Sequence, residues 1–208
     1  MNYYNNNAQN LFTRYQSVTA ETVHSLWLDL LPNKLGSACD IGAGSGRDAG
    51  WLASKGWEVT AVEPSEKLRL LGNSFTTQLP NLKKSVAWLD DSLPKLAFLV
   101  ATSKKFDLII LSAVWMHLPR TQHIEAMGTL KSLLNYNGLL IISLRNGPDP
   151  EKRFFKTNIN ELIKTAKSFP LQLVREHRDQ KDANRPEISW DSAVFKFIDG
   201  FGSHGGQL

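Results

Sequence analysis

The chain has 208 residues, a length that suits one domain and leaves little room for two. Hydrophobic residues make up 42% and charged residues 21%, which excludes a disordered, collagen-like or coiled-coil chain. Because Cys39 is the single cysteine, a disulfide framework and a four-cysteine zinc site are excluded. The net charge of +4 permits an anionic substrate but does not require one.

The N-terminal segment Met1–Asn10 is polar and Asn-rich. It lacks the basic start and apolar centre of a signal peptide. No stretch of the chain approaches the ~20 apolar residues that cross a bilayer. We therefore expect a cytoplasmic protein with no membrane partner. The scattered histidines predict no metal site.

Strands and helices alternate along the rest of the chain. Apolar residues recur at helical spacing from Thr19 to Leu31, and Pro32 ends that helix. Further helices are expected from the glycine cluster to Gly56, from Ser65 through Leu71, from Arg120 to Leu134 and from Asn158 to Phe169. Strands are expected at Ser37–Ile41, Glu58–Val62, Ser85–Leu89, Phe106–Val114 and Gly138–Leu144.

The last two expected strands, Leu171–Glu176 and Ile188–Phe197, have no helix between them. They can only pair antiparallel, as a hairpin. The alternation before them predicts an α/β fold with a doubly wound, mostly parallel sheet. We expect one domain over residues 1–199, with an N-terminal helical cap over about 1–32 and a flexible Gly-rich tail over 200–208.

A glycine-rich loop, Asp40-Ile41-Gly42-Ala43-Gly44-Ser45-Gly46-Arg47-Asp48, follows the first strand. Ligands bind at such places in open α/β sheets. A dinucleotide loop needs a small residue where Arg47 stands, and no Gly-Lys-Ser/Thr follows as in a phosphate-binding loop. Asp40 would repel a pyrophosphate and attract an ammonium group. The alternative is a glycine turn without a ligand.

Two acids downstream extend this pattern. Glu63 ends the second strand and Asp90 ends the third, so both are expected at the same edge of the sheet. A carboxylate after the second strand can accept hydrogen bonds from ribose hydroxyls, and one after the third can accept from an adenine amine. Taken singly, each acid would be a solvated strand-end or turn residue.

Together these features resemble the cofactor signature of class I S-adenosylmethionine-dependent methyltransferases. The resemblance extends from about Tyr15 to Phe197, and the segments that carry it are Asp40–Asp48, Val59–Ser65 and Phe106–Ser112. The last three residues of the glycine-rich loop, Gly46-Arg47-Asp48, and the following segment Leu52–Gly56 resemble the same region of tellurite-resistance-type small-molecule methyltransferases. The resemblance implies a Rossmann-like sheet of seven strands with an antiparallel last strand. It also implies S-adenosyl-L-methionine as cofactor and S-adenosyl-L-homocysteine as product.

The resemblance implies roles for particular positions. The methionyl part of the cofactor would be held by Asp40, by the Gly42–Gly44 backbone and by the Ser112 carbonyl. The nucleoside would be held by Glu63 at the ribose, with Pro64 beside it, and by Leu89 and Asp90 at the adenine.

Two further cofactor contacts are weighed against structural alternatives. Arg47 begins a helix and could bind the methionyl carboxylate, or it is a solvated first-turn arginine. Tyr15 would lie over the cofactor in the manner of related small-molecule enzymes, or it packs the N-terminal cap onto the sheet.

The segment after the fourth strand supplies the candidate catalytic residue. His117 would be a general base for a hydroxyl or amine acceptor, with a pKa near ~6.5 if unperturbed. Trp115 would form a wall of the acceptor site. Alternatively, His117 caps the following helix or packs under Trp115.

We therefore expect methyl transfer to an unidentified small molecule. The segment Ser112–Trp115 does not resemble the Asn-Pro-Pro-Tyr or Asp-Pro-Pro-Tyr motif typical of enzymes that methylate amino groups of flipped bases or glutamine. Two alternatives stay open: an RNA- or DNA-modifying methyltransferase that uses the basic C-terminal half, and a non-catalytic cofactor-binding subunit of a complex. The sequence leaves the acceptor and the oligomeric state open.

Overall fold

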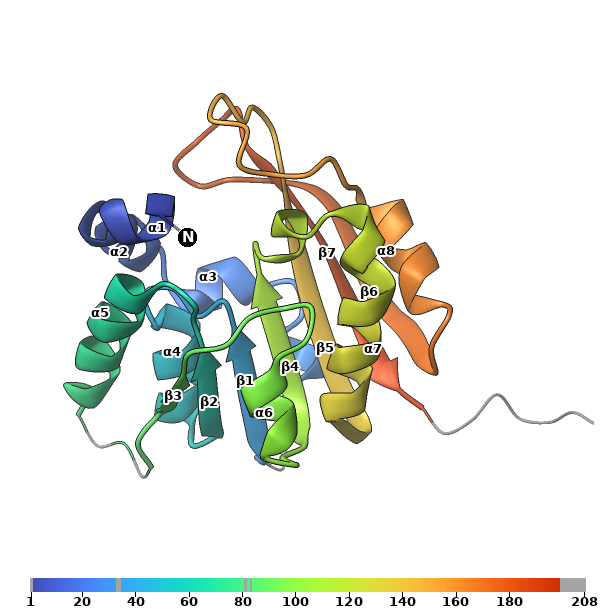
Figure 1. Cartoon of the computed structure of the whole chain (residues 1–208), viewed down its shortest axis with the longest axis horizontal. Helices are drawn as coiled ribbons and strands as arrows, with labels where there is room; N and C mark the ends of the chain where they lie inside the picture. The colour runs from blue at the N-terminus through green and yellow to red at the C-terminus, as the bar shows by residue number, and fades with distance from the viewer. Residues whose placement is uncertain (1, 33–34, 81, 83, 199–208) are drawn as a thin grey trace, which may run out of the picture.

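Seven strands form one sheet in the spatial order β3-β2-β1-β4-β5-β7-β6 (Figure 1). The structure, a computed structural model, describes residues 2–32, 35–80, 82 and 84–198. The strands are β1 Ser37–Ile41, β2 Glu58–Val62, β3 Ala87–Leu89, β4 Phe106–Ser112, β5 Leu134–Asn146, β6 Leu171–Lys181 and β7 Ser189–Phe197. Strands β1 to β5 pair parallel, and β7 is antiparallel to both β5 and β6. The predicted seven-stranded, mostly parallel sheet with an antiparallel last strand is confirmed.

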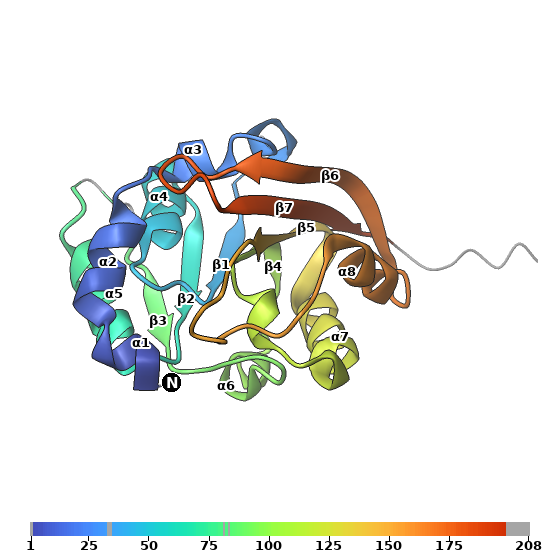
Figure 2. The same cartoon turned by 90° about the horizontal axis from the view of Figure 1, so that it is seen from above.

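Helices cover both faces of this sheet. They are α1 Asn2–Asn6, α2 Ala8–Gln16, α3 Ala20–His24, α4 Arg47–Lys55, α5 Glu66–Thr77, α6 Ala97–Ala101, α7 His123–Leu133 and α8 Ile159–Ala166, with short 3-10 helices η1 Leu28–Leu30, η2 Trp115–His117 and η3 Arg120–Gln122. Seen from above, α3 and α4 lie on one face and α6, α7 and α8 on the other (Figure 2).

The central strands bury both of their faces. In β4, Ile109 and Leu111 join the core beneath α6, α7 and α8, whereas Leu108 and Ile110 join the core beneath α3 and α4. All four side chains are inaccessible to solvent or nearly so. This continuous apolar run fits a parallel strand covered by helices on both sides. The carboxyl end of β4 is consequently held by packing on both faces.

The hairpin of β6 and β7 is irregular near the loop that joins the two strands. The register between the two strands shifts between His177 and Gln180. At this bulge Asp179 has a left-handed φ of 54°, and its backbone N–H donates to the buried carboxylate of Asp191 at 3.0 Å. A bulge of this kind bends the strand and increases its twist.

The predicted helix from Thr19 to Leu31 is interrupted in the structure. Thr19 caps the shorter α3 by accepting a hydrogen bond from the Thr22 N–H, and a turn separates α3 from η1. The break allows the Trp27 ring to lie 4.5 Å from the His24 ring, with both side chains buried. Tertiary packing has overridden the local periodicity.

Other element ends differ from the predictions by a few residues. β4 stops at Ser112 because Ala113 adopts a left-handed φ of 60°. The third strand is limited to β3, and the helix expected to reach Phe169 ends with α8 at Ala166. The predicted tail, residues 200–208, lies outside the described residues. Within the part of the chain that the structure describes, no helix has the length and apolar character needed to span a membrane.

Candidate functional site

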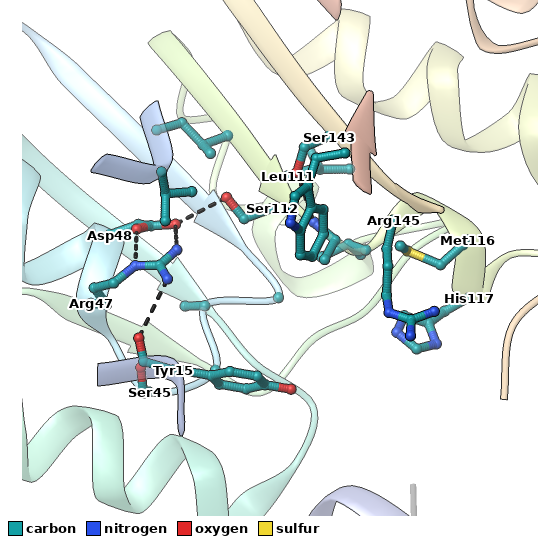
Figure 3. Close-up of a pocket in the computed structure, with 18 of the residues that line it drawn as sticks. Tyr15, Ser45, Arg47, Asp48, Leu111, Ser112, Met116, His117, Ser143 and Arg145 are labelled. Atoms are coloured by element: carbon teal, nitrogen blue, oxygen red, sulfur yellow. Dashed lines mark hydrogen bonds and ion pairs between the residues drawn. The ribbon is translucent and has the colours of Figure 1, made fainter. Parts of the chain in front are cut away.

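A cavity of about 1070 Å³ opens at the carboxyl ends of β1, β2, β4 and β5. It is lined by the glycine loop, by segments that follow β2 and β4, by the end of β5 and by the N-terminal helices. Figure 3 shows two groups of side chains around it, one near Tyr15 and Asp48 and one near His117 and Arg145. Among the predicted site residues, those that line the cavity are Tyr15, Asp40, Gly42, Gly44, Arg47, Glu63, Pro64, Ser112 and His117.

The glycine loop is held against β2 by its backbone. The N–H groups of Gly42 and Ala43 both donate to the Val62 carbonyl, at 2.8 and 3.0 Å. Gly42 and Gly44 adopt left-handed φ values of 71° and 54°, which favour glycine. A Cβ atom at Gly42 would also collide with the side chain of Val114. The loop therefore brings bare backbone to the cavity wall.

Glu63 is buried at the end of β2 and bonds to that loop. Its carboxylate accepts a hydrogen bond from the Gly44 N–H at 2.9 Å and another from the Ser65 N–H at 2.8 Å. Burial raises the pKa of Glu63, and these two hydrogen bonds oppose the rise. Each carboxylate oxygen keeps an acceptor position for a further donor, such as a ribose hydroxyl.

Asp40 is buried beneath the loop at the end of β1. Its Oδ2 atom has no hydrogen-bond partner among the described residues. Burial, and then the negative charge of Asp48, raise the pKa of Asp40 well above its usual range. A buried carboxylate oxygen without a partner is costly, and a ligand ammonium group would remove that cost. This buried acceptor fits the ammonium group at the amino-acid end of S-adenosylmethionine.

Asp48 organises a charged cluster that sequence reasoning missed. Arg47 bonds it through two nitrogens at 2.7 and 3.0 Å, His24 Nε2 lies 3.1 Å from Oδ1, and the Ser112 hydroxyl donates to Oδ2 at 3.0 Å (Figure 3). Burial would raise the pKa of Asp48, but the charges of His24 and Arg47 outweigh it and hold the pKa below its usual range. The sequence signal was a histidine on the apolar face of the first predicted helix.

Arg47 is therefore not a freely solvated arginine. Besides Asp48, it reaches the Tyr15 carbonyl at 3.4 Å. Two of its five N–H groups go to Asp48 and one to Tyr15, which leaves two for a ligand. The Tyr15 ring lies over the loop: a Cβ atom placed on Gly44 would be only 3.3 Å from two carbon atoms of the ring.

The N-terminal helices close the cavity from above. The Ser65 hydroxyl, expected to cap α5, instead donates to Asn5 Oδ1 at 2.9 Å. From α2, the Gln16 side-chain amide donates to the Ser45 carbonyl at 3.1 Å. These contacts join the N-terminal helices to the glycine loop and to the start of α5.

The two residues predicted to hold the adenine do not reach the cavity lining. The Asp90 side chain is 66% exposed and forms an ion pair with Arg69 at 2.9 Å. The Leu89 carbonyl accepts the Glu63 N–H at 3.1 Å as part of the sheet. The cavity is lined instead by the next residues, Asp91 to Leu93. The Asp91 carboxylate accepts the backbone N–H groups of Ser92 and Leu99.

The prediction of Trp115 as a wall of the acceptor site does not hold in the structure. Its side chain is 0% exposed and packs against the His123 ring at a centroid distance of 4.8 Å. The 3-10 turn of η2 points Trp115 into the core beneath α7 and turns His117 toward the cavity.

His117 lies in the cavity roof. Its Nε2 atom is 3.0 Å from the Tyr4 hydroxyl, and its ring packs edge-on against Phe154 at 5.0 Å. Burial, and then the positive charge of Arg153, lower the pKa of His117 to about 4. The imidazole is therefore neutral at pH 7, and the ordinary value near 6.5 expected from sequence is corrected.

Comparisons with known proteins identify the family of the chain. A family model described as "Methyltransferase domain" matches residues 11–184. An uncharacterized methyltransferase from Alkaliphilus oremlandii is 28% identical over 133 residues, which cover 64% of this chain and 55% of that protein. The chain thus spans about half the length of this relative.

Solved structures share the fold. Magnesium protoporphyrin IX methyltransferase from Synechocystis with bound SAH superposes with a TM-score of 0.73 at 18% identity, covering 94% of this chain and 96% of that chain. A TehB-like SAM-dependent methyltransferase from Corynebacterium glutamicum gives a TM-score of 0.62 at 18% identity, covering 90% and 96%. Because the family model matches most of its length and its sheet has the strand order β3-β2-β1-β4-β5-β7-β6, the chain belongs to the class I S-adenosylmethionine-dependent methyltransferases.

Proposed function

We propose that the protein transfers a methyl group from S-adenosylmethionine to a small-molecule acceptor. The observation that carries the proposal is Asp40, whose buried Oδ2 atom has no hydrogen-bond partner among the residues that the structure describes, at the lining of the cavity. The neighbouring glycine loop exposes backbone where a ligand can approach closely. An ammonium group is the natural partner for such a carboxylate.

The remaining cofactor contacts follow from the same geometry. The carboxylate of Glu63 would accept the ribose hydroxyls, with Pro64 beside it. The free N–H groups of Arg47 would bind the methionyl carboxylate, and the Ser112 carbonyl would receive the ammonium group. Tyr15 would cover the cofactor. We assign the adenine to the segment from Asp91 to Leu93, which lines the cavity in place of Leu89 and Asp90.

The chain's own contribution to the reaction would be alignment. When bound, the cofactor supplies a sulfonium methyl group, which the acceptor nucleophile attacks at carbon as the carbon–sulfur bond breaks and the neutral thioether leaves. The N-terminal helices exclude water, and the cavity holds the acceptor in line with the transferred methyl group.

His117 would take up the acceptor's proton. For the Nδ1 atom to accept a proton, Nε2 must carry one and donate it to the Tyr4 oxygen 3.0 Å away. In that tautomer the Tyr4 hydroxyl oxygen would accept from Nε2, and Nδ1 would be the basic nitrogen.

A calorimetric titration tests the cofactor site. The wild-type protein is expected to bind S-adenosylhomocysteine, and Asp40→Asn is expected to weaken this roughly tenfold or more, the cost of losing a charge-assisted hydrogen bond. Methylthioadenosine, which lacks the amino-acid end, should bind both proteins equally. Asp29→Asn, on the surface, serves as the control. Absence of binding by the wild-type protein would refute the proposal.

A second experiment tests the acceptor class. The protein is incubated with methyl-labelled cofactor and with cell extract separated into small molecules, polynucleotides and protein. Because the N-terminal helices line part of a cavity of about 1070 Å³, a size that suits a small molecule beside the cofactor, label is expected in the small-molecule fraction. Label in the polynucleotide fraction would favour the nucleic-acid alternative, and label appearing only when the protein fraction is added would indicate a required partner.

A further inference from the structure

A row of serine hydroxyls crosses the sheet beyond the cofactor residues. Ser112 of β4 is the register partner of Ser143 on β5, and Ser143 is the partner of Ser192 on β7. All three line the cavity. Two residues before the serine on β4 and β5, and two residues after it on the antiparallel β7, the same face carries apolar side chains in register: Ile110, Ile141 and Val194. The floor of the cavity therefore changes from apolar to hydroxyl toward the carboxyl ends of β4 and β5.

The next step along β5 adds a cation and an aromatic ring. Arg145 lies two residues after Ser143 on the same face, and its register partner on β7 is Trp190. Both line the cavity, and Figure 3 shows Arg145 on the side of His117, away from Asp48. Register partners on neighbouring strands lie close together, so an acceptor that contacts Trp190 is within reach of the guanidinium.

Most charges on this side of the cavity are already paired. Arg185 bonds Asp182 at 2.6 Å, and Arg153 lies 2.9 Å from the Glu151 carboxylate. Arg145 differs, because within the described chain no carboxylate comes within 4.0 Å of it. Its two hydrogen bonds go to backbone carbonyls, those of Gly147 at 3.4 Å and Pro148 at 2.7 Å. Three of its five N–H donors remain for a ligand.

The surroundings of Arg145 favour an incoming negative charge. Burial lowers its pKa, the charges of Arg185 and Arg153 lower it further, and the charges of Asp149 and Glu187 oppose this. The guanidinium stays charged because its ordinary pKa exceeds 12. Arg145 is thus a half-buried, permanent cation with unused donors, and a second cation, Arg185, lies near it. An oxyanion bound there would neutralise this positive charge.

We propose that the methyl acceptor carries an oxyanion, a carboxylate or a phosphate, that binds to Arg145. Hydroxyl groups of Ser143 and Ser192 donate to the same group or to the acceptor body, and Trp190 supplies an apolar surface beside it. The inference rests on the proposed function, since it names the class of molecule that fills the acceptor side of the same cavity.

The test compares three probes that share one ring and differ in charge: benzoate, phenyl phosphate and benzamide. Binding to the protein saturated with S-adenosylhomocysteine is measured by ligand-observed NMR. The wild-type protein is expected to bind at least one anionic probe about tenfold more tightly than the amide, the scale of a charge-assisted pair. The preferred anion then indicates whether the natural acceptor is a carboxylate or a phosphate ester.

Variants assign that preference to Arg145. Arg145→Gln should abolish it, and Arg145→Lys should retain part of it. Arg178→Gln is the matched control, because Arg178 bonds Glu176 and Asn160 outside the cavity lining. Melting temperatures establish that each variant is folded.

The outcomes separate this inference from the proposed function. If S-adenosylhomocysteine does not bind, the proposed function fails. If S-adenosylhomocysteine binds but the wild-type protein does not distinguish the anions from benzamide, the inference about Arg145 is overturned. The same holds if Arg145→Gln keeps the full preference.

Discussion

The two halves of the cavity are built in different ways. The cofactor half is local: Gly42, Gly44 and Glu63 are held by hydrogen bonds between β1, β2 and the loop that joins β1 to α4. The acceptor half is assembled from distant parts of the chain. Tyr4 contacts His117, which is 113 residues away in sequence, and Arg145 of β5 is the register partner of Trp190 on the neighbouring strand β7. A short motif can specify the first half, whereas the second half depends on the whole fold.

The largest effect should come from disrupting the local half. Gly44→Val places a β-branched side chain at a left-handed φ of 54° and against the Tyr15 ring. Affinity for S-adenosylhomocysteine, measured by calorimetry, should be lost. A folded variant with normal affinity would show that the loop does not contact the cofactor.

Removing the proposed base from the acceptor half should lower the rate of methyl transfer and leave cofactor binding unchanged. His117→Ala is expected to lower turnover by about 10²–10⁴-fold with cofactor affinity nearly unchanged. The neutral imidazole is the active form, and its pKa of about 4 means that the wild-type rate should be flat from pH 6 to 8 and fall only near pH 4. A rate that rises through pH 6.5 would contradict this environment for His117.

Glu63→Ala should have an intermediate effect within the cofactor half. Loss of the hydrogen bonds to this charged group is expected to weaken the binding of S-adenosylhomocysteine by about 1.5–3 kcal/mol. The carboxylate also accepts the N–H groups of Gly44 and Ser65, so the melting temperature should fall as well. An unchanged dissociation constant would remove Glu63 from the ribose site.

The smallest effect is expected at Asp90, where motif and structure disagree. Because Asp90 is exposed and pairs with Arg69, Asp90→Ala should leave cofactor affinity within about twofold. The same titration used for Glu63→Ala measures it. A loss comparable to that of Glu63→Ala would restore Asp90 as an adenine ligand.

These comparisons explain what the sequence could and could not predict. Apolar runs and the glycine cluster predicted the sheet, its antiparallel end and the positions of Asp40, Gly42 and Glu63 at the cavity, because these features depend on residues close in sequence. The pairing of His24 with Asp48 joins α3 to α4, and no local pattern encodes it.

Trp115 and Asp90 both lie outside the cavity lining, for different local reasons. Asp90 directly follows β3 and is exposed, whereas Trp115 follows the end of β4 by three residues and is buried. The left-handed φ of Ala113 redirects the segment after β4, and strand-end positions alone do not reveal such a turn.

The bulge near the end of β6 bears on how acceptor preference can change. Successive side chains of a strand face opposite sides, so a slip of β7 by one position would replace Ser192 with Ala193 in the cavity floor. The hydrogen bond from the Asp179 N–H to Asp191 fixes the hairpin against such a slip. The hairpin lies at the opposite end of the sheet from β2 and β3. Substitutions at positions 190 and 192 are therefore expected to change the proposed acceptor side without disturbing the contacts of Glu63 with the glycine loop.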